Sequence, residues 1–389
     1  SGDAIENAPV PTLIYHHQPF GTNIAQAEDD LLERWRLLDE RAVIPKNDVH
    51  EEVKVMDSCA WYRDGKYYAL TGNKHLRPGF EGDCTSLFTS VDLRNWTYQG
   101  PFYRPNRNWT TEQDDCACQD FFPLGNRFML IMHTHKPTPF VQYYLGRMEG
   151  DNFVPENHGR MSWPGGSLAG PETMLDGTGR RLFFAWVPEG PGGSDYWKNE
   201  TNWSGLVSLP RLLSLAEDGS LRIHPVPELE ALRYNPRHIE ARPLTTGVWQ
   251  GLPDIQGDCM EIDAEFAIGE SKAVGIAVRC SPDDEEHVRI MYDLSEGVIR
   301  ISSRTNGPVG AFLANQQEAP FTTMGETVRF RIFVDQSVIE VFADDRQCLT
   351  QRAYPSHPDS LGLRVFSSGG SDSKLLRLQA WDMMPTAAI

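Results

Sequence analysis

Basic residues are scarce in this 389-residue chain. It has 36 lysines and arginines against 54 aspartates and glutamates, which gives a formal net charge of −18. So acidic a chain repels phosphate backbones and anionic lipid headgroups, which argues against nucleic acid or a membrane surface as its main partner. The sequence also lacks any run of about 18 apolar residues, so we expect no transmembrane helix.

Cysteine is also sparse. The seven cysteines form an odd, scattered set, which favours free thiols over a disulfide framework; they are Cys59, Cys84, Cys116, Cys118, Cys259, Cys280 and Cys348. The Cys116-Ala117-Cys118 stretch has no His/Cys pair at zinc-like spacing beside it. We therefore expect no metal and no cofactor.

The start of the chain lacks two common features. It opens on Ser1-Gly2-Asp3, without an initiator methionine and without a basic-then-apolar signal segment. We therefore expect that something upstream was removed, and the sequence leaves open whether the protein is cytoplasmic or secreted.

Short strand-like runs bounded by turn residues fill the first part of the chain. They lie at 11–15, 66–71, 127–133, 141–147 and 181–187, separated by turns such as Asp64-Gly65. Comparable strand pairs recur about every 40–60 residues, the length of a propeller blade with four short strands. The pattern predicts an all-β propeller over residues 1–235, including a linker with a short helix at 228–233.

A second all-β region follows. Period-2 alternation is clearest at 329–334 and 338–342, within strands expected at 328–334 and 338–343. Further strands are expected at 260–268, 273–280, 288–294, 298–303 and 361–367. Seven or more such strands in about 150 residues are typical of an antiparallel sandwich. The sequence therefore predicts a β-sandwich domain over residues 236–389.

Several motifs resemble one enzyme family. Residues 333–342 read F-V-D-Q-S-V-I-E-V-F and 350–355 read T-Q-R-A-Y-P, while G-P-E-T-M-L-D at 170–176 precedes G-R-R-L-F-F-A-W at 179–186. Three further stretches belong to the same set: L-P-R at 209–211, P-E-L at 227–229 and S-G-D-A at 1–4, which is similar to S-G-S-A. Together these motifs resemble glycoside hydrolase family 32, the invertase, inulinase and levanase family. The resemblance spans nearly the whole chain and implies a five-bladed propeller followed by a sandwich.

That family uses three carboxylates, and the chain departs from the pattern at each. The nucleophile motif W-M-N-D-P-N-G is absent from the sequence. The stabiliser motif R-D-P is replaced by M-D-S at 56–58, which keeps a carboxylate at Asp57. The resemblance assigns Asp57 the stabiliser role; the alternative is an aspartate that merely holds a turn.

The acid/base glutamate of the family's E-C motif has no single counterpart. Anchoring on the family's C-P-D motif places Ala117 at the glutamate position, whereas anchoring on carboxylate-Cys places Asp115 there. Residues 115 and 117 share a face of an extended strand, so Asp115 is the first candidate. Glu172, in place of the family's pocket glutamine, is the second, because burial and nearby acids would raise its pKa. Glu112 is a third candidate, or else a solvated loop residue.

The resemblance also implies a sugar pocket. The candidate substrate-binding residues are polar side chains and tryptophans that reach a sugar face: Asp83, Thr85, Ser86, Trp61, His133, His135, Trp163 and Trp186. The tryptophans are alternatively propeller core, which is the first interpretation for Trp186. His133 and His135 alternate onto one strand face, without a third ligand that would favour a metal.

The leading hypothesis is therefore a glycosidase that cleaves β-fructofuranosides, such as sucrose or fructans, with retention. Its nucleophile would come from a complementing N-terminal chain or fragment, so this chain alone would be inactive. One alternative is a non-catalytic fructan-binding protein, and another within the enzymes is a fructosyltransferase. An inverting arabinan- or xylan-type propeller enzyme is disfavoured by the sandwich motif.

Overall fold

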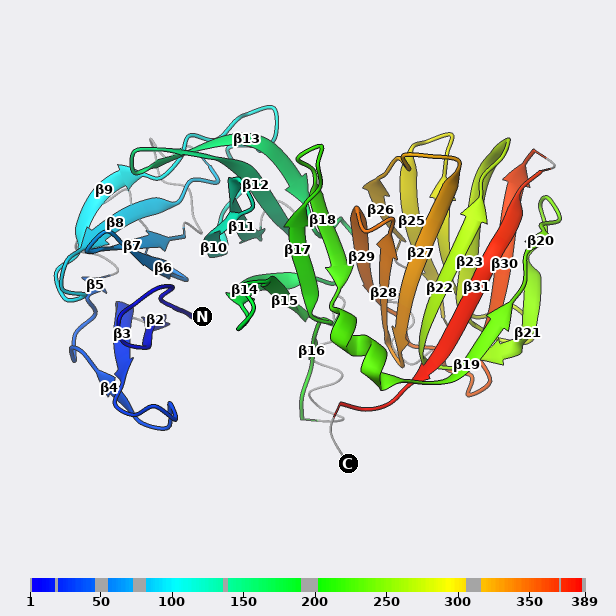
Figure 1. Ribbon diagram of the computed structural model, residues 1–389, viewed down its shortest axis with the longest axis horizontal. Coiled ribbons are helices and arrows are strands. Elements are labelled where there is room, and N and C mark those ends of the chain that lie inside the picture. Colours follow the sequence, from blue (N-terminus) through cyan, green and yellow to red (C-terminus); the bar gives the residue numbers. More distant parts are fainter. Residues whose placement is uncertain are drawn as a thin grey trace. The chain divides into compact units, whose positions relative to one another are not determined.

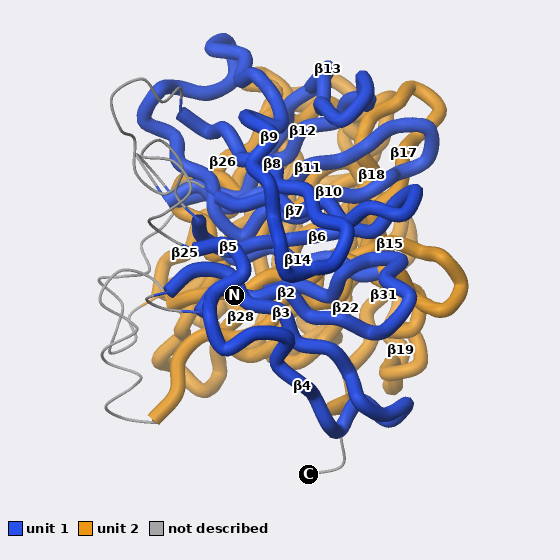
Figure 2. Tube along the Cα trace, turned by 90° about the vertical axis from the view of Figure 1, so that its left-hand side faces the viewer, with its two compact units in different colours: residues 1–160, 169–174 blue, residues 161–168, 175–389 orange. Residues whose placement is uncertain are grey.

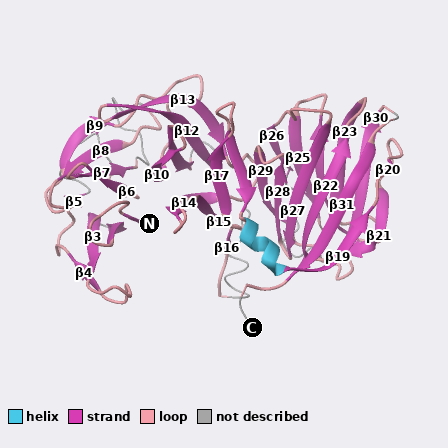
Figure 3. Cartoon of the chain, viewed as in Figure 1, coloured by secondary structure: helices cyan, strands magenta, loops and turns pink. Residues whose placement is uncertain are grey.

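The computed structural model describes residues 2–17, 20–45, 55–72, 82–135, 139–189, 202–305, 316–370 and 372–386. Strands dominate these ranges, and their only helix is a short 3₁₀-helix (Figure 3). The chain divides into two compact units, one of residues 1–160 with 169–174 and one of residues 161–168 with 175–389 (Figure 2). The all-β fold class expected from the sequence is confirmed.

The first unit contains three antiparallel meanders. The first sheet consists of β1 (Gly2–Ala4), β2 (Thr12–His17), β3 (Gly21–Ala27) and β4 (Trp35–Leu37), with β5 (Ile44–Pro45) beside β3. The second consists of β6 (Cys59–Arg63), β7 (Lys66–Thr71), β8 (Ser86–Ser90) and β9 (Thr97–Pro101). The third consists of β10 (Ala117–Leu124), β11 (Arg127–Thr134), β12 (Phe140–Glu149) and β13 (Asn152–Arg160). Figure 1 traces the third meander, in which each strand pairs with the next along the chain. The unit also holds most of β14 (Ala169–Leu175).

Apolar side chains fill the space between these sheets. Ile14 and Ile24 of the first sheet share a buried cluster with Phe88 of the second, and Leu70 of the second shares another with Met132 of the third. The second sheet is therefore covered on both faces, and consecutive residues of β7 and β8 are buried as a result. The first strands of the three sheets lie together, since β6 packs against both β1 and β10.

The expected turn chemistry holds at the β6–β7 hairpin. Asp64 and Gly65 have φ of 51° and 78°, the left-handed conformation at both central positions of a two-residue hairpin turn. Aspartate tolerates this conformation and glycine adopts it freely. The D-G pair therefore fixes the hairpin, and β7 spans the residues predicted for it.

The second unit begins with a smaller antiparallel sheet and a linker. β15 (Arg181–Val187) pairs with β16 (Leu206–Val207) and β17 (Arg211–Leu215), and β17 pairs with β18 (Leu221–Pro225). The 3₁₀-helix η1 (Pro227–Leu232) follows, close to the helix expected at 228–233. These strands cluster with the sandwich in one unit, whereas the sequence places a domain boundary at residue 235. That boundary stays a prediction.

Two facing sheets form the rest of the second unit. One has the order β19-β31-β22-β27-β28-β29, with β20 beside β31, and the other has the order β21-β30-β23-β24-β25-β26. Their bounds are β19 (Arg233–Ile239), β20 (Arg242–Pro243), β21 (Gln250–Gln256), β22 (Cys259–Ala267), β23 (Ser271–Cys280), β24 (His287–Asp293), β25 (Val298–Arg304), β26 (Gln316–Pro320), β27 (Thr327–Asp335), β28 (Val338–Ala343), β29 (Gln347–Arg352), β30 (Gly362–Gly369) and β31 (Lys374–Met383).

Alternation along β27 shows why this region folds as a sandwich. Phe330 and Ile332 are buried in the core between the sheets. Arg329, which precedes Phe330, points to the other face, where it forms a bidentate pair with Asp263 at 2.8 Å. A strand with one apolar and one charged face requires a second sheet on the apolar side. The predicted sandwich strands are therefore confirmed to within two residues at each end.

Candidate active site

Four acidic residues of the first unit converge at the first strands of its sheets. Asp3 lies on β1, Asp120 on β10 and Glu172 on β14, and Asp57 precedes β6 by two residues. Burial and mutual repulsion act on these carboxyls together, because Asp120, Asp3 and Asp57 all raise the pKa of Glu172. We call this group the carboxylate cluster.

Glu172 has the most strongly altered acidity in the carboxylate cluster. Burial raises its pKa from 4.5 to about 9, and the charges of Asp120, Asp3 and Asp57 contribute in that order. Desolvation penalises the ionised form, and like charges penalise it further. Glu172 therefore carries a proton at neutral pH, which is the state that a general acid requires.

Asp120 fixes the strand that carries Glu172. Its Oδ2 atom accepts the backbone N–H of Thr173 at 3.1 Å and also the Thr173 hydroxyl. Asp120 is 5% exposed, so a partner for its charge is needed within the protein. These bonds join β10 to β14 one residue from Glu172.

Asp3 and Glu172 line the same cavity. The cavity has a volume of about 370 Å³, and its walls are Gly2, Asp3, Ala4, Leu13, Ile14, Tyr15, Glu172 and Thr173. Burial and the charge of Asp120 raise the pKa of Asp3 to about 8. The sequence analysis missed both Asp3 and Asp120. A signal existed for each: Asp3 replaces the second serine of S-G-S-A, and Asp120 stands at the aspartate of C-P-D.

Both the backbone and the side chain of Asp57 are held in place by neighbouring residues. It has φ of 45°, a left-handed conformation that aspartate tolerates better than most residues. Its carbonyl accepts a bond from Nε2 of Gln119, and Sγ of Cys118 lies 3.7 Å from Oδ2. The backbone is thus pinned while the carboxylate stays near Glu172. Its stabiliser role stays a prediction.

Asp115 has a different set of neighbours. Its Oδ1 accepts the backbone N–H of His135 at 2.6 Å, and its Oδ2 lies 3.5 Å from Nδ1 of the same residue. It is not among the main causes of the raised pKa of Glu172. Ala117 is fully buried and pairs with His133 across β10 and β11, and Glu112 is exposed. The acid/base assignment to Asp115 stays a prediction.

The predicted polar sugar contacts lie in two places. Asp83, Thr85 and Ser86 are buried before and at the start of β8. Asp83 accepts a hydrogen bond from the Tyr144 hydroxyl, and burial raises its pKa to about 6 despite that bond. The ring centroids of His133 and His135 lie 4.4 Å apart, as expected for side chains on the same face of a strand.

The three candidate tryptophans have three different environments. Trp61 stacks on Tyr68 at 5.4 Å within the aromatic core of the first unit. Trp163 packs against the sandwich core. Trp186 was interpreted first as core, and that interpretation is wrong, because its side chain is 48% exposed. Alternation along β15 buries Phe183 and Ala185 and turns Trp186 to the opposite face.

All seven cysteines are free thiols, as expected. The described ranges contain no group of three or more His, Cys, Asp or Glu side chains placed to hold a metal ion. No helix in those ranges has the length and apolar character needed to cross a bilayer.

Two family models match almost the entire chain. The model of the glycosyl hydrolases family 32 N-terminal domain matches residues 1–225, and that of the family 32 C-terminal domain matches residues 228–382. The chain belongs to glycosyl hydrolase family 32. This membership confirms the resemblance found in the motifs.

Curated relatives within family 32 are distant. The chain is 26% identical over 390 residues to a fructan 6-exohydrolase of Beta vulgaris, covering 84% of this chain and 62% of that protein. It is 25% identical over 401 residues to a sucrose-6-phosphate hydrolase of Zymomonas mobilis, covering 95% and 75%. A levanase of Bacillus subtilis is 26% identical over 317 residues, covering 74% and 45%. The matched region thus spans less than two thirds of the first and third relatives.

Solved structures share the fold over the whole chain. Fructan 1-exohydrolase IIa of Cichorium intybus superposes with a TM-score of 0.81 at 21% identity, covering 99% of this chain and 83% of that one. An exo-inulinase of Aspergillus awamori gives a TM-score of 0.78 at 18% identity, covering 100% and 84%. The family 32 fold is therefore retained at low sequence identity.

Proposed function

We propose that this protein takes part in the hydrolysis of β-fructofuranosides with retention of configuration. The observation that carries the proposal is the partly buried Glu172, whose raised pKa of about 9 favours the protonated form at neutral pH, beside Asp3 in a cavity of about 370 Å³. Family 32 membership and relatives named fructan exohydrolase, sucrose-6-phosphate hydrolase and levanase support this substrate class.

The proposed roles follow from protonation state. Glu172 donates a proton to the leaving-group oxygen, because its pKa of about 9 keeps it protonated until the reaction. Asp57 binds the fructosyl hydroxyls and stabilises the positive charge of the oxocarbenium-like transition state. Asp115 stays the alternative acid/base, with His135 as its partner.

A retaining mechanism also needs a nucleophilic carboxylate about 5–5.5 Å from the acid. The printed sequence has no W-M-N-D-P-N-G motif. We propose that a complementing N-terminal segment supplies the nucleophile, and that the propeller has five blades. The propeller would span residues 1–235 and the sandwich residues 236–389.

Reconstitution tests this proposal. The purified chain is incubated with sucrose, a short inulin-type fructan or levan, alone and with a peptide that carries the N-D-P motif and its flanking strands, and released fructose is measured. We expect turnover only in the mixture, and a loss of about 10²–10⁴-fold in kcat for Glu172→Gln. Glu40→Gln is the matched control, because Glu40 is exposed and is not among the acid/base candidates. Full activity of the chain alone would contradict the complementing segment.

A non-catalytic fructan-binding protein is the second candidate. The observation in its favour is Ala117, a fully buried methyl group at the position that motif alignment gives to the family's glutamate. Fructan binding by calorimetry without turnover, in both the chain and the mixture, would establish this candidate. A fructosyltransferase would instead produce longer oligosaccharides as sucrose concentration rises, which chromatography of the products detects.

A further inference from the structure

Strand β10 of the first unit departs from regular pairing beside the carboxylate cluster. In its register with β11, Ala117 faces His133 and Asp120 faces Ile131, so three steps along β10 oppose two steps along β11. One extra residue therefore sits in β10, and Cys118 within this stretch has φ of 46°. A bulge of this kind re-aims a side chain out of the regular alternation of a strand, and bulges are common beside active sites.

Gln119 lies in this bulge, and its side chain reaches the neighbouring sheet. It is 2% exposed, and its Nε2 donates hydrogen bonds to the carbonyl of Asp57 and, at 3.2 Å, to the carbonyl of Leu70. Both partners are acceptors, so the amide nitrogen faces them and the amide oxygen points away. A Cβ atom at Gly72 would lie 2.7 Å from Oε1 of Gln119, so glycine leaves the room that the amide needs. Gln119 thus joins β10 to β7 and to the segment before β6.

Two further contacts pin the residues on either side of Asp57. The carbonyl of Met56 accepts the backbone N–H of Gly72 at 2.7 Å. The hydroxyls of Ser58 and Thr22 share a hydrogen bond at 2.8 Å. Residues 56–58 are therefore held from β3, from β10 and from the residue after β7.

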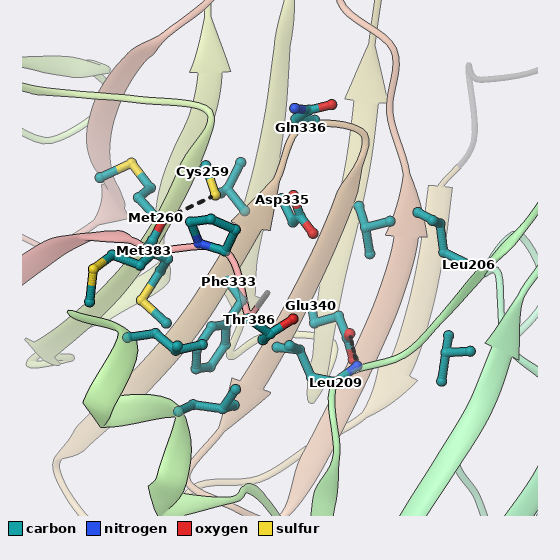
Figure 4. A pocket seen from close by; sticks show the side chains of 17 residues that line it. Leu206, Leu209, Cys259, Met260, Phe333, Asp335, Gln336, Glu340, Met383 and Thr386 are labelled. Atoms are coloured by element: carbon teal, nitrogen blue, oxygen red, sulfur yellow. Dashed lines mark hydrogen bonds between the residues drawn. The ribbon is translucent and has the colours of Figure 1, made fainter. Parts of the chain in front are cut away.

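A buried carboxylate can instead be held by its own oxygens, as Glu340 of the second unit is. Its Oε1 accepts the Leu209 backbone N–H at 2.7 Å (Figure 4), and its Oε2 pairs with Arg211 at 2.6 Å. Both oxygens of Glu340 are thus occupied by donors from the protein. Gln119 holds Asp57 by the carbonyl and takes up neither carboxylate oxygen, so these oxygens can accept hydrogen bonds from a sugar.

We propose that Gln119 is a positioning residue that keeps the Asp57 carboxylate in place for a fructosyl group. This inference rests on the sugar-binding role proposed for Asp57. Asp57 has φ of 45°, a conformation that costs free energy in any residue with a side chain, and the bond to its carbonyl offsets that cost. Without the bond, the backbone relaxes and the carboxylate moves from its place, and small displacements of such groups weaken both binding and catalysis. A proline at position 119, as in the C-P-D motif, would have no amide to donate.

A double-mutant cycle tests the coupling of Gln119 to Asp57. Calorimetry measures the binding of a short inulin-type fructan to the full chain and to the reconstituted mixture. We expect Gln119→Met to weaken binding by about three- to tenfold, as for the loss of one hydrogen bond to the sugar. Asp57→Gly removes the carboxylate and still adopts the left-handed conformation. In that background Gln119→Met should change binding by less than about twofold, because the group that it positions is absent.

Gln317→Met is the matched control for the loss of a buried amide donor. Gln317 is fully buried, and its Nε2 donates to the Thr350 carbonyl at 3.0 Å, but it belongs to the second unit. We expect both methionine variants to lower Tm and only Gln119→Met to weaken fructan binding. Gly72→Ala, which crowds the Gln119 amide without removing it, should weaken binding in the same direction.

The outcomes separate this inference from the proposed hydrolysis. Equal effects of Gln119→Met in the parent and Asp57→Gly backgrounds, or equal effects of the two methionine variants on binding, would overturn the role of Gln119 and leave hydrolysis standing. Fructan binding that depends on Gln119, without turnover in the mixture, would support the role of Gln119 and overturn hydrolysis. A parent protein that neither binds nor cleaves fructan would overturn both.

Discussion

Thr173 donates its backbone N–H and its hydroxyl to the same oxygen of Asp120, one residue from Glu172. The two bonds tie β14 to β10 at the point where the carboxylate cluster forms. Because Asp120 is buried, these donors compensate for the water that its carboxylate has lost. Thr173 is thus a positioning residue for Glu172.

Thr173→Val removes the hydroxyl donor and keeps the shape of the side chain. We expect it to lower the free energy of unfolding by about 1–3 kcal/mol, as for a hydrogen bond to a charged group, and to lower kcat of the reconstituted protein more than it changes KM. Thr178 offers a matched control, since its hydroxyl also bonds an aspartate, Asp176, but in an exposed turn. Thr178→Val should cost under about 0.5 kcal/mol. Equal costs for the two variants would contradict the role assigned to Thr173.

The raised pKa of Glu172 predicts a pH dependence of stability. Between its ordinary pKa of 4.5 and the folded value of about 9, the folded protein holds a proton that the unfolded chain has released. The free energy of unfolding therefore falls as pH rises from about 5 to about 9, and this contribution is fully present below about pH 5. Denaturant titrations across this range measure it.

Glu172→Gln cannot ionise, so its stability should fall less steeply over the same pH range. Asp3, with a pKa raised to about 8, keeps part of the dependence in this variant. Glu40→Gln, at an exposed glutamate with no assigned role, should leave the slope unchanged. The same slope in Glu172→Gln as in the parent protein would show that Glu172 ionises normally.

The buried ion pair of Arg211 and Glu340 should be far more sensitive than a surface pair of equal length. Arg211 and Glu340 meet at 2.6 Å with almost no exposure, whereas Arg147 and Glu149 meet at 2.6 Å with more than half of each side chain exposed. Arg211→Met leaves a buried carboxylate unpaired, which costs about 3–5 kcal/mol. Arg147→Met should cost under about 1 kcal/mol. Thermal unfolding of both variants checks the contrast, and similar losses would contradict it.

Two tryptophans separate core packing from sugar binding. Trp61→Ala removes a ring that stacks on Tyr68 and packs at a tilt against Phe121, and should lower the free energy of unfolding by about 3–5 kcal/mol. Trp186 is 48% exposed, so Trp186→Ala should cost under about 1 kcal/mol. If Trp186 is a sugar platform, the same variant weakens fructan binding in calorimetry. Unchanged binding would leave Trp186 without a role in the sugar pocket.

Local sequence patterns were sufficient for the strands. The alternation at 328–334 identifies β27 because one face of that strand must meet another sheet, and the Asp64-Gly65 pair identifies a hairpin because few residues adopt its backbone angles. Glu172 was also a candidate from sequence, since a carboxylate replaced a pocket amide. Such features depend only on residues that are close together in the chain, and these can be read directly from the sequence.

The composition of the carboxylate cluster needed the tertiary structure. Asp3 lies 117 residues before Asp120, and Asp120 lies 52 residues before Glu172. Only the packing of the first strands against one another brings these carboxyls together. The alternation along β15 likewise predicts the face on which Trp186 lies, but it does not predict whether other residues cover that face. The sequence by itself determined an all-β chain of family 32 type with a candidate acid at Glu172. Only the tertiary structure decided which carboxyls surround that acid, because repulsion and desolvation depend on distances through space.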